Sequence, residues 1–368
     1  MTFEVAILGR GFAGLSAAWE ALKAIPPEKI IIFGRVGVGI RASEVAQGIL
    51  SNKGLKIAQA PLFQAKLDSL DRVDNWVRQI ESLSGRRINR AFLGVYEPFL
   101  DEIDYKKVVS RVYKERYYGI YGSNLVKANL PYFRNINYMR YPLDGWIDAR
   151  ELIVTLENHL KSSGCKFVDQ DVTEMNFESN LFNLSGTLDS RVQSKRLIVA
   201  CGAKNSCVLR KLSVEIPKTK TVSGHVLSFG IKGPISQPVA MVKNTNSLII
   251  RKGEALLGST SWKEQTINQD LHDLEKKSLL TSLENDFSFD IRAALNPKAL
   301  WGHRELSKDR LPYWGALPHS TIRNLFTIGG LYKSGLQISS LLAEACVADM
   351  LGKRVDSLAS HFHVSRWY

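Results

Sequence analysis

Short apolar runs that end in glycine recur along the chain, and each predicts a buried β-strand. They lie at residues 3–8, 196–202 and 324–330 and consist largely of aliphatic and aromatic residues. Strands buried on both faces show such runs, whereas half-buried strands alternate between apolar and polar residues. We therefore expect these three runs to be neighbouring strands of one parallel sheet, brought together from distant parts of the chain.

Helical spacing follows the first and the last of these runs. After the first run, apolar residues stand at i, i+3, i+4 and i+7, namely Leu15, Ala18, Trp19 and Leu22. Pro26 and Pro27 end this helix, and residues 29–33 predict a second strand. A further helix is predicted from Gly335 to Gly352. A third helix is predicted after the capping-box sequence Asp148-Ala149-Arg150-Glu151, with a stop at Gly164.

The segments between these elements differ from them in sequence pattern. Residues 217–295 contain strand-like stretches at 225–229, 247–251 and 255–257. We expect two domains: a discontinuous first domain of residues 1–50, 142–216 and 296–368, and a second domain of residues 51–141 and 217–295.

A glycine-rich turn joins the first strand to its helix, and its sequence is Gly9-Arg10-Gly11-Phe12-Ala13-Gly14. Strand, turn, helix and second strand follow one another within about 33 residues, as the dinucleotide-binding fingerprint requires. Gly9 allows the tight turn, Gly11 lets the backbone approach a pyrophosphate, and Gly14 lets the helix pack close to the strand. The acidic residue that should follow the second strand is missing, and Phe33-Gly34-Arg35 stands there instead. Arg35 favours either a ribose 2′-phosphate or a ribose held by backbone atoms.

Composition adds an excess of positive charge. The 368 residues include 49 Lys and Arg against 36 Asp and Glu, a net charge of +13. This excess favours anionic ligands such as nucleic acid, phosphates or carboxylates, or it serves solubility alone. Four cysteines without a CxxC pair indicate neither a zinc site nor a redox dithiol. With no predicted membrane helix or signal peptide, the expected location is the cytoplasm.

Residues 105–141 interleave basic and aromatic side chains. Lys106, Lys107 and Arg111 are among eight basic residues that stand there with a single acid, Glu115, and several tyrosines. Basic residues neutralise phosphates and aromatic rings stack on unpaired bases, so one interpretation is a nucleic-acid surface. The other is a solvated sheet or helix face with half-buried tyrosines.

Six motifs in order along nearly the whole chain resemble those of one family, the FAD-dependent D-amino acid oxidase family. Its members include glycine oxidase, sarcosine oxidase and an oxidase of tRNA wobble-uridine modification. The motifs are the glycine turn with Leu8 to Ala18, Ala42-Ser43 through Gln47-Gly48, Gly145 to Asp148, Val199 to Ala203, Arg304 to Gly315, and Gly330 to Leu336.

The resemblance implies noncovalent FAD and an α/β fold: a Rossmann-like FAD-binding domain of the GR2 type with an inserted α+β substrate domain on a mixed or antiparallel sheet. The loop 330–335 has no cysteine or histidine that could tether the ring. The residues expected to bind FAD are Gly9, Gly11, Phe12, Ala13, Gly14, Arg35, Ala42, Ser43, Gln47, Gly48, Val172, Ala200, Gly202, Gly330, Leu331, Tyr332, Lys333, Ser334, Gly335 and Leu336.

The resemblance also implies the chemistry, which is oxidation of a C–N bond followed by imine hydrolysis, with oxygen as acceptor and release of peroxide. Arg304 is expected to bind the substrate carboxylate, because its planar fork pairs with a carboxylate in two places. Lys333 stands where glycine oxidase-like members often carry arginine and is a second candidate. The cofactor performs the hard step, so no general base is assigned, and His225, His303 and His319 are interpreted as structural.

Two substrates fit this resemblance: a small amino acid such as glycine or sarcosine, and a carboxymethylaminomethyl uridine in a tRNA anticodon. Both contain an N–CH2–COO⁻ unit. The net charge and residues 105–141 favour the tRNA. A hypothesis of another class is a flavin-binding protein without catalytic activity.

Overall fold

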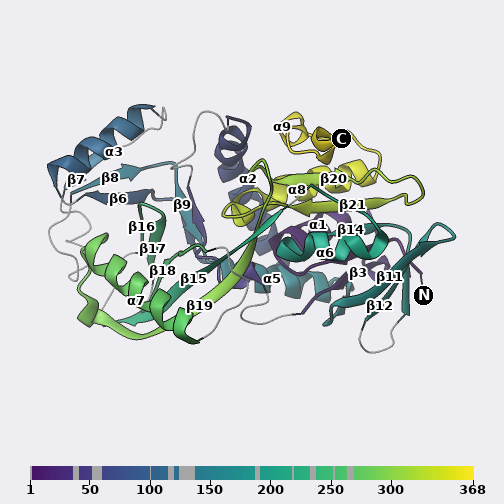
Figure 1. Cartoon of the computed structure of the whole chain (residues 1–368), viewed down its shortest axis with the longest axis horizontal. Coiled ribbons are helices and arrows are strands. Elements are labelled where there is room, and N and C mark those ends of the chain that lie inside the picture. The colour runs from purple at the N-terminus through teal and green to yellow at the C-terminus, as the bar shows by residue number, and fades with distance from the viewer. Residues whose placement is uncertain are drawn as a thin grey trace.

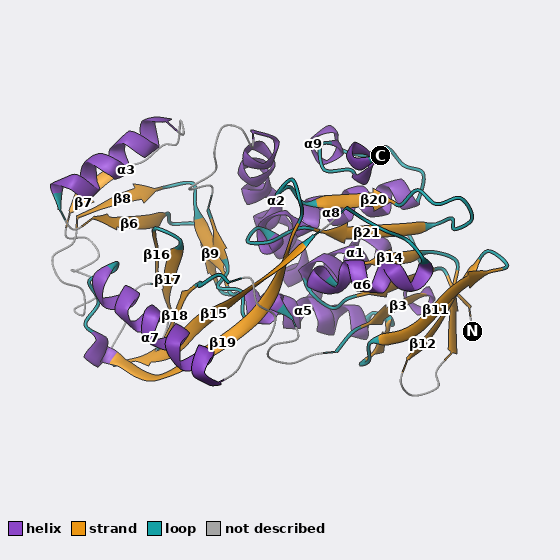
Figure 2. Cartoon of the chain, viewed as in Figure 1, coloured by secondary structure: helices purple, strands orange, loops and turns teal. Residues whose placement is uncertain are grey.

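The computed structural model describes residues 2–35, 41–51, 60–99, 101–114, 120–123, 137–186, 191–217, 219–232, 238–251, 253–262 and 269–368. These residues form two bodies side by side (Figure 1). In Figure 2, helices gather around the sheet of the right-hand body, whereas strands dominate the left-hand body, and the long strands β15 and β19 run between the two.

A six-stranded sheet is the centre of the right-hand body in the described part of the chain. Across the sheet the strands are β10 (Lys166–Val168), β3 (Ile30–Phe33), β2 (Val5–Leu8), β14 (Leu197–Val199), β21 (Leu325–Gly329) and β20 (Tyr313–Ala316). The first five are parallel, with Ile7 opposite Ile198 and Ile198 opposite Phe326, and β20 is antiparallel to β21. The three glycine-ended runs are therefore neighbouring parallel strands, and this prediction is confirmed.

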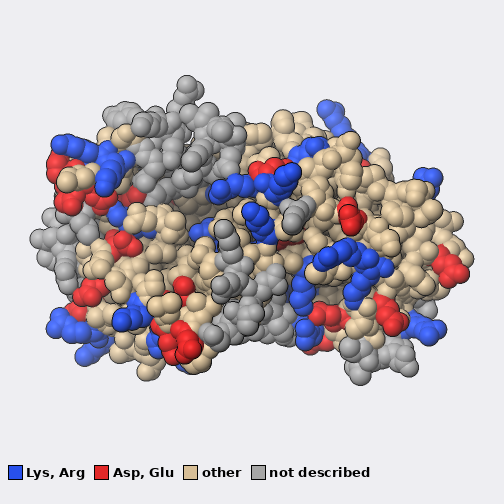
Figure 3. Space-filling view, in the orientation of Figure 1, with Lys and Arg blue, Asp and Glu red and all other residues tan. Residues whose placement is uncertain are grey.

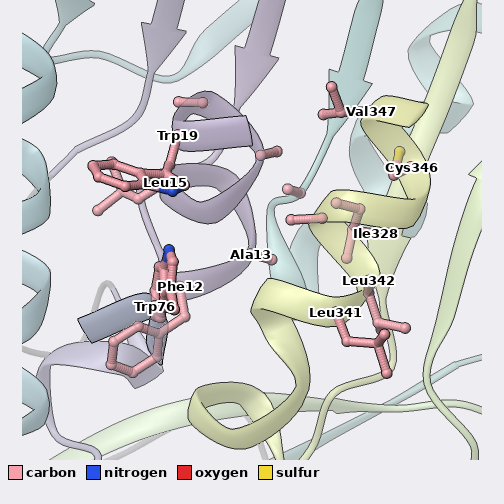
Figure 4. Packing of buried hydrophobic residues seen from close by; sticks show 14 of the residues in the cluster. Phe12, Ala13, Leu15, Trp19, Trp76, Ile328, Leu341, Leu342, Cys346 and Val347 are labelled. Carbon is pink, nitrogen blue, oxygen red and sulfur yellow. The ribbon is translucent and has the colours of Figure 1, made fainter. Parts of the chain in front are cut away.

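Both faces of this sheet are buried, which explains the continuous apolar runs. Val5 and Ile7 of β2 join one hydrophobic cluster, and Ala6 and Leu8 join another. The first cluster lies under the helices α1 (Phe12–Leu22), α2 (Ala60–Ser84), α5 (Ala149–Ser162) and α8 (Gly335–Met350). Figure 4 shows part of this cluster, with residues such as Leu15 and Trp19 on α1 and Leu342 and Cys346 on α8.

A four-stranded sheet covers the opposite face. Its strands are β1 (Thr2–Phe3), β13 (Arg191–Ser194), β12 (Leu181–Gly186) and β11 (Val172–Glu178). Phe182 and Leu184 of β12 pack in the second hydrophobic cluster together with Leu8 and Phe33. The short helices α6 (Asn205–Leu209) and α9 (Ser357–Ser360) lie on the same body.

The second body is built on a mixed sheet, as expected. Eight strands form it within the described residues: β19 (Ala294–Leu306), β15 (Lys220–Ile231), β18 (Glu254–Gly258), β17 (Asn246–Arg251), β16 (Val239–Lys243), β6 (Val95–Phe99), β8 (Asn137–Tyr141) and β7 (Ile120–Ser123). The pairs are antiparallel except for β16 with β6. Leu279 and Leu283 of α7 (Gln269–Asn285) and Val108 of α3 (Glu102–Lys114) pack into its clusters.

Elements from the two expected domains also interlock. Ala65, Val73 and Trp76 of α2, from the segment 51–141, pack in the cluster that contains α1 and α8. β9 (Gly145–Ile147) pairs with β4 (Ile49–Leu50) and β5 (Arg90–Ala91), and β19 continues through residue 296. The division of the chain at the expected boundaries stays a prediction.

Asp148 caps α5 as its position predicts. Its side chain accepts hydrogen bonds from the backbone N–H groups of Arg150 and Glu151, each at 3.1 Å. The reciprocal half of the capping box is different, because Glu151 accepts a hydrogen bond from the N–H of Asn89 at 2.7 Å. The N-terminus of α5 is thereby tied to the segment before β5.

None of the helices in the described part of the chain combines the length and the apolar composition needed to cross a bilayer. On the face seen in Figure 3, Lys and Arg side chains gather across the middle of the molecule.

Candidate active site

A cavity of about 800 Å³ is lined by both bodies. Residues at and just beyond the carboxyl ends of β2, β14 and β21 form one part of its wall, among them Gly9, Cys201 and Gly330. Gly224 and Val226 of β15 and Arg304 of β19 form another. The carboxyl ends of parallel strands are where ligands bind in open α/β sheets.

Most residues predicted to bind FAD or substrate line this one cavity. They are Gly9, Gly11, Phe12, Ala13, Arg35, Ala42, Ser43, Gln47, Gly48, Val172, Ala200, Gly202, Arg304, Gly330, Leu331, Tyr332, Lys333, Gly335 and Leu336. Gly14 and Ser334 are not among the lining residues. Gly14 serves packing, because a Cβ built there would lie 1.9 Å from the carbonyl oxygen of Gly9.

The glycine turn brings backbone close to backbone. Gly9 has a φ of +119°, and a Cβ on it would lie 2.1 Å from the carbonyl oxygen of Ala200. Gly11 is the N-cap residue of α1 and, as a glycine, has no side chain that could cap the helix. Ser43 Oγ accepts a hydrogen bond from the N–H of Phe12 at 3.1 Å. The positive end of α1 lies at the cavity wall, which Gly11, Phe12 and Ala13 line, and this fits a bound pyrophosphate.

Gln47 and Gly48 hold the loop after β3 against both bodies. The Gln47 side-chain amide donates to the carbonyl oxygens of Ser247 at 2.7 Å and Leu256 at 3.1 Å. A Cβ on Gly48 would lie 1.8 Å from the carbonyl oxygen of Ile147. The amide N–H groups of Gln47 are thus directed at β17 and β18.

Asp171 supplies the carboxylate that the end of β3 lacks. It lines the cavity and pairs with Arg35 at 3.1 Å and with Lys204 at 3.3 Å. β10 runs parallel to β3, with Val168 opposite Phe33, so the residues that follow both strands meet at one edge. Sequence reasoning missed Asp171, which lies three residues beyond the end of β10.

Two arginines near the glycine turn are paired with acids and brace it. Arg10 is 4% exposed and contacts Glu157 of α5, and its Nη1 donates to the carbonyl oxygen of Gly34 at 2.9 Å. Arg41 contacts Glu44 and donates to the carbonyl oxygen of Arg10 at 2.8 Å. The opposing charges lower the pKa of Glu157 despite its burial.

Arg304 lies half-buried on β19 with its guanidinium at the cavity. Its Nη1 donates to Ser259 Oγ at 3.2 Å and its Nη2 to the carbonyl oxygen of Thr260 at 2.8 Å. Its Cζ lies 5.6 Å from the centre of the Tyr332 ring. No carboxylate in the described residues forms an ion pair with it, and burial lowers the pKa of its guanidinium. This arrangement leaves a positive charge at the cavity for an anionic ligand.

Lys333 follows Tyr332 on the loop beside the cavity. Its Nζ lies 5.9 Å from the Tyr332 ring centre, so both cations are within 6 Å of this ring. Surrounding protein and the charge of Arg304 lower the pKa of Lys333 to about 8. The structure therefore brings both predicted carboxylate contacts to one region.

Lys66 of α2 is a further cation that sequence reasoning missed. Its side chain is buried, lines the cavity and donates to the carbonyl oxygen of Ser51. Burial lowers its pKa to about 8, and the charge of Asp144 opposes that shift. The α2 pattern offered no signal, because the docking of α2 against α8 decides where Lys66 points.

Glu305 is a buried carboxyl group beside Arg304 in the sequence and was also missed. It accepts hydrogen bonds from Tyr313 OH at 2.8 Å, the N–H of Gly330 at 2.9 Å and Asn205 Nδ2 at 3.1 Å. Burial raises its pKa to about 7, although the hydrogen bonds oppose the shift.

The three histidines considered from sequence have structural partners. His225 is fully buried, stacks on Trp262 and shares a hydrogen bond of 2.6 Å with His272. Burial lowers the pKa of His225 to about 4. His303 Nδ1 and Ser223 Oγ are 2.6 Å apart, although His303 also lines the cavity. His319 Nδ1 accepts two backbone N–H groups within its own turn.

Much of the basic and aromatic segment 105–141 lies outside the described residues. Lys106 and Lys107 are exposed on α3. Tyr138 and Tyr141 are buried, and Tyr141 OH donates to Glu97 at 2.5 Å. These two tyrosines belong to the core and are not available to stack on bases.

Comparison with family models decides the family. Residues 4–350 match the DAO model, described as FAD dependent oxidoreductase. The chain belongs to this family. It is therefore an FAD-dependent oxidoreductase, as the motifs predicted, and its cofactor is FAD.

Relatives of known structure share the fold. The TM-score is 0.84 both with iminodiacetate oxidase of Chelativorans sp. BNC1, which is 15% identical, and with glycine oxidase of Geobacillus kaustophilus, which is 20% identical. The alignments cover 98% of both chains in the first case and 99% of both in the second. The fold of this chain is thus that of these two oxidases.

A curated relative is the bifunctional protein ThiO/ThiG of Synechocystis sp., 22% identical over 385 residues. The match covers 100% of this chain and 54% of that protein, so the chain spans about half the length of this curated relative.

Proposed function

We propose that the protein oxidises the C–N bond of an amine that carries a glycine-like carboxylate, and that Arg304 binds this carboxylate. The observation that carries the proposal is the guanidinium of Arg304 at the cavity without an acidic partner in the described residues. Partial burial of a cation without a counter-ion is costly, and an anionic ligand would offset this cost.

The cavity wall offers a distinct role for each group of residues toward FAD. The start of α1 with Gly9 and Gly11 receives the pyrophosphate, and Asp171 is placed to accept hydrogen bonds from a ribose. The loop from Gly330 to Leu336 and the start of α8 border the space for the ring system. When bound, FAD supplies the acceptor for a hydride from the carbon next to the amine nitrogen.

The residues of this chain orient the substrate for that step. Arg304 grips the carboxylate in a fork, and Lys333 adds a second positive charge on the same side of the cavity. The amine reacts in its neutral form, and water hydrolyses the resulting imine to a carbonyl compound and ammonia, or to a carbonyl compound and an amine where the substrate nitrogen carries a substituent. Oxygen as electron acceptor, with release of peroxide, completes the proposed cycle.

The experiment that tests this is anaerobic mixing of the FAD-loaded protein with candidate amines, followed by its visible absorbance. We expect glycine, sarcosine or iminodiacetate to bleach the visible absorbance band of the oxidised flavin. Iminodiacetate belongs in the panel because the cavity presents two cations, Arg304 and Lys333. A flavin that no amine bleaches would favour the non-catalytic alternative.

A second candidate substrate is the carboxymethylaminomethyl uridine of a tRNA anticodon. The net charge of +13 and the exposed Lys106 and Lys107 support it. The same absorbance measurement with modified and unmodified tRNA distinguishes it from a free amino acid.

Binding of tRNA should also weaken steeply with salt, because each neutralised phosphate releases counterions. Replacing Lys106, Lys107 and Arg111 by Glu should reduce binding and leave the flavin content unchanged. Undetectable or salt-independent tRNA binding at low ionic strength would exclude this candidate in favour of a small substrate.

A further inference from the structure

The Glu305 carboxyl group joins elements that belong to two different sheets. Glu305 is near the end of β19 in the eight-stranded sheet. Its hydrogen-bond donors include Tyr313 on β20, Gly330 just after β21 and Asn205 on α6, and the side chain of Thr219 is a further one. β20 and β21 belong to the six-stranded sheet. One side chain therefore ties the strand that carries Arg304 to the sheet that carries the cofactor loop.

The backbone strengthens the same connection. The carbonyl oxygen of Glu305 accepts a hydrogen bond from the N–H of Tyr332 at 3.0 Å. Asn205 Nδ2 also lies 3.0 Å from Tyr313 OH and from the carbonyl oxygen of Ile328. Glu305 is 4% exposed, and Asn205 and Tyr313 are fully buried. The loop 330–333 is thereby held to β19 at both Gly330 and Tyr332.

The Glu305 carboxyl group is compensated by hydrogen bonds alone. In the described part of the chain no Lys or Arg forms an ion pair with this carboxyl group. Burial, and not a neighbouring charge, has the largest effect on its pKa. Replacing a buried acceptor by a donor leaves its partners unsatisfied, which is costly inside a protein.

We propose that Glu305 is a positioning residue that fixes the Arg304 guanidinium relative to the loop 330–333. Both residues line the cavity, but hydrogen bonds from β20, from the residue after β21 and from α6 hold the Glu305 carboxyl group, whereas the Arg304 guanidinium donates to Ser259 and Thr260. Successive side chains of a strand point to opposite faces, which explains these different partners. Arg304 Cζ lies 5.6 Å from the Tyr332 ring centre, and Tyr332 is the residue whose N–H the Glu305 backbone holds. A shift of about 1 Å at a substrate anchor is enough to lower catalysis strongly.

The kinetic part of this inference rests on the proposed function, so the experiment has two independent readouts. The first is hydrogen exchange of the peptide that covers residues 329–335 in the FAD-loaded protein. Glu305→Gln keeps the shape of the side chain but turns one acceptor into a donor that faces other donors. We expect amide exchange in this peptide to become about 10-fold faster.

Glu97→Gln is the matched control. Glu97 is 1% exposed, accepts a hydrogen bond from Tyr141 OH and is not among the cavity-lining residues. It therefore reports the general effect of losing a buried carboxyl group. Exchange in residues 329–335 should stay at the wild-type rate in this variant.

The second readout is a double-mutant cycle on kcat/KM for glycine, with sarcosine or iminodiacetate as replacements. Glu305→Gln alone should lower kcat/KM about 10-fold, and in an Arg304→Ala background it should lower it less than about 2-fold. A further 10-fold loss in that background would mean that Glu305 does not act through Arg304, and would overturn the proposal.

The outcomes separate this inference from the proposed function. If no amine reduces the wild-type enzyme, the proposed function is wrong, and hydrogen exchange alone decides the role of Glu305. Unchanged exchange in residues 329–335 of Glu305→Gln would overturn the positioning role, whatever the kinetics. Faster exchange in Glu305→Gln, together with exchange at the wild-type rate in Glu97→Gln, supports the positioning role.

Discussion

Gly224 leaves the space that the guanidinium of Arg304 occupies. A Cβ built on Gly224 would lie 1.8 Å from Nη2 of Arg304 and 2.3 Å from the carbonyl oxygen of Thr260. Gly224 stands on β15 opposite Gly302, and Arg304 lies two residues further along β19. The absence of a side chain at residue 224 is thus a requirement for the position of the proposed carboxylate anchor.

Gly224→Ala should displace Arg304 and lower kcat/KM for a carboxylate-bearing amine about 10- to 100-fold, because the anchor no longer reaches its place. FAD content should remain that of the wild type. Gly230→Ala on the same strand is the control, since its nearest neighbour, Leu295 Cβ, would be at an ordinary 3.5 Å. Steady-state kinetics of the two variants side by side measure the effect, and equal activity would contradict it.

Arg304→Ala should remove about 2–4 kcal/mol of binding or transition-state stabilisation, roughly 30- to 1,000-fold in kcat/KM. The cause is a carboxylate left unpaired in a partly dehydrated site. Arg304→Lys should recover only part of the loss, because a point charge cannot make the forked contact. FAD occupancy and melting temperature should change little. A variant whose flavin is reduced as fast as that of the wild type would show that the carboxylate is held elsewhere.

The purified protein should be yellow, and acid precipitation should release its flavin into the supernatant. Gly11→Val should abolish FAD binding, because its side chain would occupy the place of the pyrophosphate. A Cβ at Gly11 would already lie 3.0 Å from Ser43 Oγ, which accepts the hydrogen bond of Phe12 N–H. Absorbance of the supernatant after reconstitution with FAD measures binding, and a yellow Gly11→Val protein would refute the placement.

The lowered pKa of Lys333 leads to a prediction of how anion binding depends on pH. Its pKa of about 8 lies below the ordinary value, so its ammonium is charged below pH 8 and loses its charge as the pH rises through 8. Inhibition by glycolate, which has no amine to titrate, should therefore weaken severalfold between about pH 7 and pH 9.

Lys333→Arg should flatten this pH profile, because a guanidinium stays charged across the range. Lys66 has a similar pKa of about 8 and lines the same cavity. Lys66→Met therefore serves as the comparison. If the profile flattens in Lys66→Met and persists in Lys333→Arg, Lys66 and not Lys333 is the titrating group.

The parallel sheet and the glycine turn were predictable from sequence because their signals are local. Burial on both faces requires a continuous apolar run at β2, β14 and β21, and the tight turn requires glycine at residue 9. β15 was predicted only at residues 225–229, whereas it extends over Lys220–Ile231. Gly224 and polar residues break its apolar pattern, while backbone pairing with β19 continues past them.

The remaining parts of the site depend on contacts between distant residues. Asp171 reaches the cavity because β10 pairs in register with β3, and Glu305 is buried because two sheets meet around it. No single stretch of sequence records either arrangement. Arg304 and Lys333 were found only through their family motifs, and the structure adds that both lie close to the ring of Tyr332.

The strand order of the parallel sheet also governs how the protein is made. β2 emerges from the ribosome early, but β14 has β21 as its second neighbour, and α1 packs in one cluster with α8. Until residues 325–350 have been synthesised, apolar faces of β14 and α1 lack these partners. Such a nascent chain exposes apolar surface over most of its translation, and exposed apolar surface favours aggregation. The cavity wall is likewise incomplete until its lining residues within 330–337 have been synthesised.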